Sequence, residues 1–243
     1  MNTAIGRVLW VAAFVVIGAL NAMADDGTGN TRSPTSAADG EKPKVVIDQS
    51  SAKATLDTMA KAFKARDGAA LTACLPPEYK DSMGPMMVGM MDVMAKADSL
   101  KRTVEAKFGK EVAEKALASS PAGGKSDGPL EGGLNADGSI DWKKVKVTEN
   151  GDTATVEIEG KPSTETLKKI NGKWCMEMKG LTPEKAKAQG AQGAKMAKAM
   201  SKGLEEVDKQ VKDGKVTKDD LEKVMGEVMM KAMAEAMKDT APN

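Results

Sequence analysis

Two predicted β-hairpins between residues 140 and 180 place the strongest constraint on the fold of this 243-residue chain. Their turns are Asn150-Gly151 and Asn171-Gly172. Asn-Gly between alternating strands is the strongest short hairpin signal, because both residues tolerate the positive φ angles of a type I′ turn. The short segment 160–162 joins the hairpins, so the sequence predicts a four-stranded antiparallel meander. The expected strands cover residues 142–148, 153–159, 164–170 and 173–178.

The N-terminus has the pattern of a secretory signal peptide. Arg7 precedes an apolar run over residues 8–20, and Ala22-Met23-Ala24 is a small-x-small cleavage site. We expect cleavage after Ala24, which makes residues 1–24 the signal peptide and predicts a periplasmic or secreted protein. The apolar run is too short to cross a bilayer, so no membrane span is expected after cleavage. Residues 25–45 are rich in Gly, Ser, Thr, Asp and Pro, which predicts a disordered leader.

Helical patterns lie on both sides of the predicted sheet. Apolar residues recur at helical spacing after position 50, and a longer helical region from about 85 to 118 is expected to break near Asp98-Ser99. Thr182-Pro183 is a typical helix start, with the threonine as cap. The fold class is therefore α+β: N-terminal helices packed on a curved meander in a domain over 46–181, and a C-terminal helical hairpin over 182–243.

The last predicted helix carries a broad apolar stripe. Methionines recur along it every four residues, and the stripe is too wide to face solvent alone. It must pair with the preceding helix, cover the domain or form a homodimer. Pairing within the chain is the default, because the connection is short. The methionines concerned are Met225, Met229, Met233 and Met237.

Composition excludes several classes of function. Removal of Arg7 with the signal peptide leaves 35 basic and 35 acidic side chains, a balance that argues against a nucleic-acid partner. The chain has no histidine, so Ser-His, Cys-His and imidazole–metal chemistry are impossible. We therefore predict a protein that is not an enzyme and needs no cofactor.

The chain contains two cysteines, Cys74 and Cys175. An even count in an exported chain is consistent with one disulfide between them. The alternative is two separately buried thiols. Reactive-thiol catalysis is not favoured, because no basic partner adjoins either cysteine in the sequence.

Methionines also cluster between residues 83 and 94, where three interpretations are open. Thioether sulfur is a soft ligand that suits Cu(I), and four of the methionines would share one helical face. Methionine also fills irregular cores, which is the favoured interpretation, and it forms adaptable surfaces that bind other polypeptides. The four candidate ligands are Met83, Met87, Met90 and Met94.

The order of helix, short helix, longer helix and meander resembles the ketosteroid-isomerase-like superfamily, also called nuclear-transport-factor-2-like. The residues that carry the resemblance are Ala54-Thr55-Leu56-Asp57-Thr58-Met59-Ala60-Lys61-Ala62-Phe63, the turn Arg66-Asp67-Gly68-Ala69-Ala70-Leu71 and the two hairpins. It looks most like the small exported, uncharacterised members and covers about 46–181. The resemblance implies a sheet that curls into a cone whose open end holds a pocket. No residue matches the catalytic positions of the enzymatic members.

Strand alternation selects two residues for such a pocket. If Trp174 faces the helices, Cys175 and Glu177 face the other side of the sheet, which lines the cavity in a cone. Glu177 and Cys175 are therefore the pocket candidates. A Cys74–Cys175 disulfide would require that same face to meet the short helix, so the two expectations compete.

These observations together predict an exported, non-catalytic module that binds an unknown small molecule or protein. Binding would use the cone pocket or a methionine-rich apolar face. One alternative is a small-molecule enzyme of the isomerase-like fold, with Glu177 as its acid. The other alternative is a methionine-rich Cu(I)-binding protein.

Overall fold

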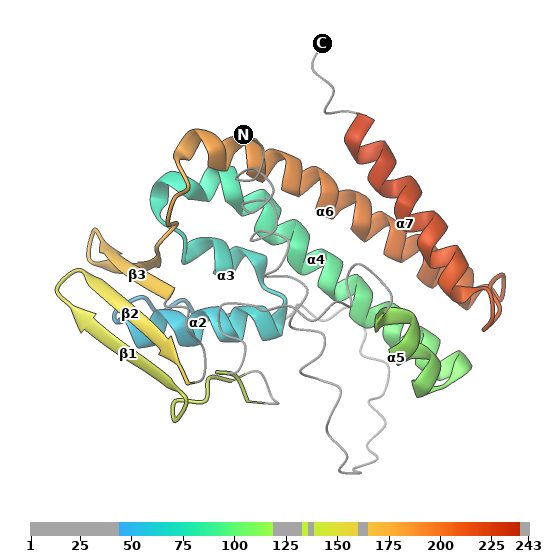
Figure 1. Ribbon diagram of the computed structural model, residues 1–243, viewed down its shortest axis with the longest axis horizontal. Helices are drawn as coiled ribbons and strands as arrows, with labels where there is room; N and C mark the ends of the chain where they lie inside the picture. Colours follow the sequence, from blue (N-terminus) through green and yellow to red (C-terminus); the bar gives the residue numbers. More distant parts are fainter. Residues whose placement is uncertain (1–43, 119–132, 136–138, 160–164, 239–243) are drawn as a thin grey trace.

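A computed structural model describes residues 44–118, 133–135, 139–159 and 165–238, and Figure 1 shows their arrangement. The predicted signal peptide and most of the predicted leader lie outside these residues. An antiparallel sheet lies at one end of the molecule and the helices extend away from it, so the predicted α+β class is confirmed. The helices are α2 (Ala52–Ala65), α3 (Gly68–Ala73), α4 (Pro77–Phe108), α5 (Lys110–Ala118), α6 (Pro183–Lys212) and α7 (Leu221–Lys238). The strands are β1 (Val145–Asn150), β2 (Thr153–Ile158), β3 (Glu165–Ile170) and β4 (Lys173–Met176).

The sheet is the predicted meander, with strand order β1-β2-β3-β4 and antiparallel pairing throughout. In the second hairpin Asn171 and Gly172 have φ values of 52° and 77°, as a type I′ turn requires. The first hairpin differs from its prediction by one residue. Asn150 pairs with Thr153, so the loop is Gly151-Asp152, and only Gly151 has a positive φ, the pattern of a type II′ turn.

Helix α2 lies between two apolar cores. Its residues Leu56 and Ala60 pack against the sheet in a cluster that contains Val156 and Trp174. On its other side, Met59 belongs to a larger cluster formed by the helices. The side chain of Ser51 caps the helix by accepting a hydrogen bond from the Ala54 N–H. Helix α2 therefore joins the meander to the helical part of the molecule.

Helix α4 is continuous across Asp98-Ser99, so the predicted break at this position is wrong. The Asp98 carboxylate accepts hydrogen bonds from Nε and Nη2 of Arg66 at 3.1 and 3.0 Å, which fixes this part of α4 against the end of α2. The chain leaves the helix at Gly109, whose φ of 92° is easily adopted only by glycine. Asp98 is therefore a packing residue and not a helix breaker.

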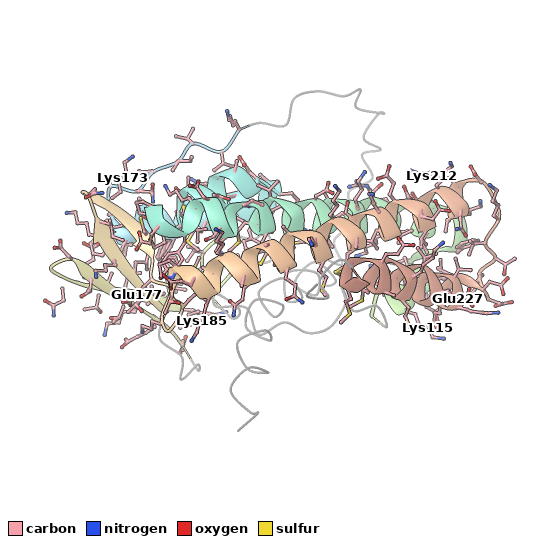
Figure 2. All side chains as sticks on the ribbon, turned by 90° about the horizontal axis from the view of Figure 1, so that it is seen from above. Lys115, Lys173, Glu177, Lys185, Lys212 and Glu227 are labelled. Carbon is pink, nitrogen blue, oxygen red and sulfur yellow. The ribbon has the colours of Figure 1, made fainter. Side chains whose placement is uncertain are left out.

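Helices α4 and α6 run parallel and very close together (Figures 1 and 2). Ser201 donates a hydrogen bond to Asp92, and the Lys96 ammonium lies 3.2 Å from the Glu205 carboxylate, so residue numbers rise in the same direction along both helices. A Cβ atom on Gly190 would overlap the backbone carbonyl of Ser82. Gly190 therefore allows α6 to approach α4 closely.

Helix α7 returns along α6 and completes the predicted helical hairpin. The Thr217 hydroxyl accepts a hydrogen bond from the Asp220 N–H and donates one to the Asp220 carboxylate, which fixes the turn directly before α7. Met225 and Met229 are buried in the helical cluster, so the predicted pairing with the preceding helix is confirmed. A homodimer through α7 stays a prediction.

Within the described part of the chain, no helix has both the length and the apolar character needed to cross a membrane.

Residues on both sides of position 182 share the helical cluster. Met83, Met90 and Met94 come from α4, while Leu204 and Val207 come from α6. The C-terminal hairpin thus contributes to the same core as the helices that precede the sheet.

Candidate functional site

The outer edge of strand β4 is closed by two segments from the N-terminal half of the chain. The Trp174 N–H donates to the Gln49 carbonyl at 3.0 Å, and the Met176 N–H donates to the Cys74 carbonyl at 2.9 Å. The Gln49 side chain adds a bond from Nε2 to the Trp174 carbonyl at 2.6 Å. An edge strand would otherwise expose these polar groups to another chain. The segment before α2, the end of α3 and strand β4 are therefore held together at one place.

A half-open hollow of about 480 Å³ lies where these three segments meet. Four of its lining residues are polar or charged: Gln49, Ser50, Lys80 and Lys173. The full lining is Ile47, Gln49, Ser50, Ala73, Lys80, Gly172 and Lys173. Lys173 lies at the free tip of the sheet (Figure 2).

The two lysines act electrostatically on one point beside the hollow, the sulfur of Cys175. Burial raises the pKa of the Cys175 thiol, and the charge of Glu78 adds to this increase. The ammonium groups of Lys80 and Lys173 and the hydrogen bond from Gln49 act in the opposite direction on the same pKa. The effect of burial is the larger one, so a negative charge on Cys175 itself is disfavoured in spite of the two lysines.

The structure brings the two cysteines together at this place as free, buried thiols. Gln49 Nε2 lies 3.7 Å from Cys175 Sγ, so Cys175 sits directly beside a residue that lines the hollow. Cys74 lies deeper and is 0% exposed. Burial, followed by the charge of Cys175, raises the pKa of the Cys74 thiol to about 12. Both thiols are therefore protonated at neutral pH.

Cys175 and Glu177, the two predicted pocket residues, have different surroundings. Trp174 packs toward α2 and Cys175 alternates with it, as expected from strand geometry. Cys175 is nevertheless buried, because the end of α3 and Gln49 cover the edge of β4. Glu177 is half-buried, donates its N–H to the Thr166 carbonyl and does not line the hollow. Figure 2 shows Glu177 near the junction with α6, away from Lys173.

The methionines of α4 serve mainly as core residues. Met83, Met90 and Met94 are buried in the helical cluster, and Met87 packs against it. The sulfur of Met94 also lies 3.8 Å from Arg66 Nη1, a cation that would oppose a metal ion there. The packing interpretation is confirmed, and the Cu(I) site stays a prediction. Within the described ranges, no three His, Cys, Asp or Glu side chains are grouped to hold a metal.

Sequence reasoning did not find Gln49, Ser50 or Lys80. Lys173 belongs to the second hairpin, but the other residues come from segments far from it in the chain. No local motif marks them, because the hollow exists only when the edge of β4 meets the end of α3.

Comparison with known proteins identifies no relatives of this chain. No family model matches it, and neither the curated proteins nor the solved structures contain a match.

Proposed function

We propose that the chain is an exported, non-catalytic binding module that holds a small organic anion in the hollow beside β4. The observation that carries this proposal is that two lysines, Lys80 and Lys173, line one half-open hollow whose described lining contains no acidic residue. A ligand carboxylate placed between them would gain two charge-assisted hydrogen bonds. The proposal retains the expected export and binding role, and it moves the binding site from the open face of the sheet to its edge.

The rest of the lining favours a ligand with a short apolar part. Ile47 and Ala73 supply apolar surface, whereas the Gln49 amide already donates to the Trp174 carbonyl. Two acidic groups lie nearby without lining the hollow. Asp48 accepts hydrogen bonds from the N–H and hydroxyl of Ser50, and Glu78 acts on Cys175.

Two features support binding rather than catalysis. The chain has no histidine, which removes the most common general base. The thiols of Cys74 and Cys175 have raised pKa values, so little thiolate is present at neutral pH to act as a nucleophile.

The resemblance to ketosteroid-isomerase-like proteins remains part of the proposal for residues 46–181. The order of helices before a meander supports it.

The proposal is tested by calorimetric titration with hexanoate and with its uncharged analogue hexanamide. We expect hexanoate to bind and hexanamide to bind at least about tenfold more weakly, because the two ammonium groups recognise charge. The Lys80→Met/Lys173→Met variant should lose this preference. Lys185→Met removes an exposed lysine on α6, outside the hollow, and serves as the matched control with unchanged affinity.

Two results would contradict the proposal. One is equal binding of hexanoate and hexanamide by the wild-type protein. The other is no saturable binding of hexanoate up to roughly 10 mM, since this concentration detects dissociation constants even weaker than about 1 mM. The expected export is checked separately by the intact mass of protein recovered from the exported fraction, which should begin at Asp25.

A further inference from the structure

We infer that Cys74 and Cys175 form an intrachain disulfide in two ordered steps, with Cys175 as the first thiol to react and Cys74 as the resolving thiol. The basis is the backbone pairing at the edge of β4. The Met176 N–H donates to the Cys74 carbonyl at 2.9 Å, so Cys74 is paired with the residue that directly follows Cys175. This inference does not depend on whether the hollow binds an anion.

The backbone pairing places the two cysteines within reach of each other. The hydrogen bond joins the Cys74 carbonyl to the peptide nitrogen that directly follows Cys175, so the two cysteines are near neighbours. Disulfide-bonded cysteines usually have Cα atoms about 4.4–6.8 Å apart. The charge of one thiolate also acts on the other sulfur, which indicates that the side chains are close as well. Formation of the bond would require local rotations that bring the two sulfur atoms together.

The order of reaction follows from what lies around each sulfur. Cys175 Sγ is 3.7 Å from Gln49 Nε2, and Gln49 lines the half-open hollow. Lys80 and Lys173 line the same hollow and would attract an anionic disulfide reagent such as oxidised glutathione. Cys74 is 0% exposed and Cys175 is 3% exposed, and Cys74 has no such contact with a side chain that lines the hollow within the described hydrogen bonds. A reagent in the hollow therefore meets Cys175 first.

The chemistry is thiol–disulfide exchange with a small-molecule disulfide or a dithiol–disulfide exchange protein as oxidant. The Cys175 thiol loses its proton, and the thiolate attacks one sulfur of the oxidant, which breaks that S–S bond and releases one reduced thiol. Cys74 then loses its proton and attacks Cys175 Sγ in the mixed disulfide, which releases the second reduced thiol. Two cysteine thiols are oxidised and one disulfide of the oxidant is reduced to two thiols.

The bond would join the corner between α3 and α4 to strand β4. Helix α3 ends at Ala73, directly before Cys74, and β4 contains Cys175. The closed loop would contain about 100 residues, a length for which loop-closure entropy predicts a large effect. We expect the oxidised protein to melt about 10 °C above the reduced protein.

The test exposes the full chain to oxidised glutathione and follows it by intact mass and peptide mapping after alkylation in denaturant. The wild-type protein should become two hydrogen atoms lighter and yield a Cys74–Cys175 linked peptide. Cys74→Ala should instead accumulate a glutathione adduct on Cys175. Cys175→Ala should keep Cys74 unmodified at least about tenfold longer, because Cys74 is deeper. Circular dichroism verifies that both variants fold, and alanine avoids placing a new polar group in a buried site.

Three outcomes would overturn the inference. In the first, the wild-type protein keeps a glutathione adduct and does not close the internal bond. In the second, Cys175→Ala is modified as fast as Cys74→Ala, which would remove the proposed order. In the third, wild-type thiols stay unmodified under conditions that oxidise a control dithiol peptide.

Discussion

Single glycines in this chain have opposite roles that depend on what surrounds them. A Cβ on Gly190 would overlap the Ser82 carbonyl, which belongs to a backbone and cannot move aside. A Cβ on Gly226 would meet nothing within 4 Å, although Gly226 also lies inside a helix. The first glycine is required by packing, whereas the second only weakens its helix.

We therefore expect Gly190→Ala to lower the free energy of unfolding by about 1–3 kcal/mol, because α6 must move away from α4. Gly226→Ala is the matched control and should raise the same free energy by up to about 1 kcal/mol through helix propensity. Urea unfolding followed by circular dichroism measures both changes. Equal effects of the two substitutions would show that α6 does not approach α4 as described.

The thiol of Cys74 predicts a pH dependence of stability in the reduced protein. Its pKa rises from an ordinary value of 9.0 to about 12 in the folded state because of burial. Between these values the unfolded chain releases the proton and the folded chain retains it, so ionisation favours unfolding. Below pH 9 the thiol therefore does not lower the free energy of unfolding, and this free energy falls as the pH rises from 9 toward 12.

Unfolding of the reduced wild-type protein and of Cys74→Ala, measured between pH 8 and 10.5, checks this expectation. The wild-type protein should lose stability relative to the variant above pH 9, by at most about 1.4 kcal/mol per pH unit. A constant difference between the two proteins across this range would mean that the Cys74 thiol ionises in the folded state as readily as in the unfolded state.

At the scale of elements, helix α2 is fixed to α4 by the pair formed between Arg66 and Asp98. The Arg66 side chain is only 8% exposed, and Asp98 accepts hydrogen bonds from its Nε and Nη2. Asp98→Ala would leave a buried cation without its partner, so we expect a loss of about 3 kcal/mol. Asp57→Ala removes the exposed pair with Lys61 and should cost less than about 1 kcal/mol. Thermal unfolding of both variants distinguishes the buried pair from the exposed one, and a similar small loss in both would contradict the assignment.

Local signals predicted some elements correctly, while contacts between distant segments decided the others. Asn171-Gly172 and Thr182 specify their structures through their own backbone and side chain, so the second hairpin and the start of α6 could be predicted from the sequence. Asp98 looked like a helix breaker because the local sequence does not show that it pairs with Arg66, which is 32 residues away. The direction of α6 along α4 and the hollow beside β4 also depend on contacts between residues that are far apart in the chain. Neither has a local sequence signal.

At the scale of the whole molecule, the core continues across the predicted domain boundary at position 182. The α4 methionines and α6 residues such as Leu204 lie in one cluster. We expect a fragment of residues 25–181 to expose the α4 face, bind a hydrophobic dye and melt with low cooperativity. The chain of residues 25–243 is the control. Cooperative unfolding of the short fragment without dye binding would instead show that residues 46–181 fold independently.

The parallel packing of α4 and α6 also sets how this chain must reach its native state. Ser82 and Gly190 meet in the folded protein but are 108 residues apart (190 − 82). Parallel neighbours cannot be joined by a short turn, and here the whole meander lies between them. Folding rates fall as contacts join more distant residues, because loop-closure entropy must be overcome before those contacts stabilise the chain. We therefore expect this largely helical protein to fold more slowly than a bundle of sequential antiparallel helices.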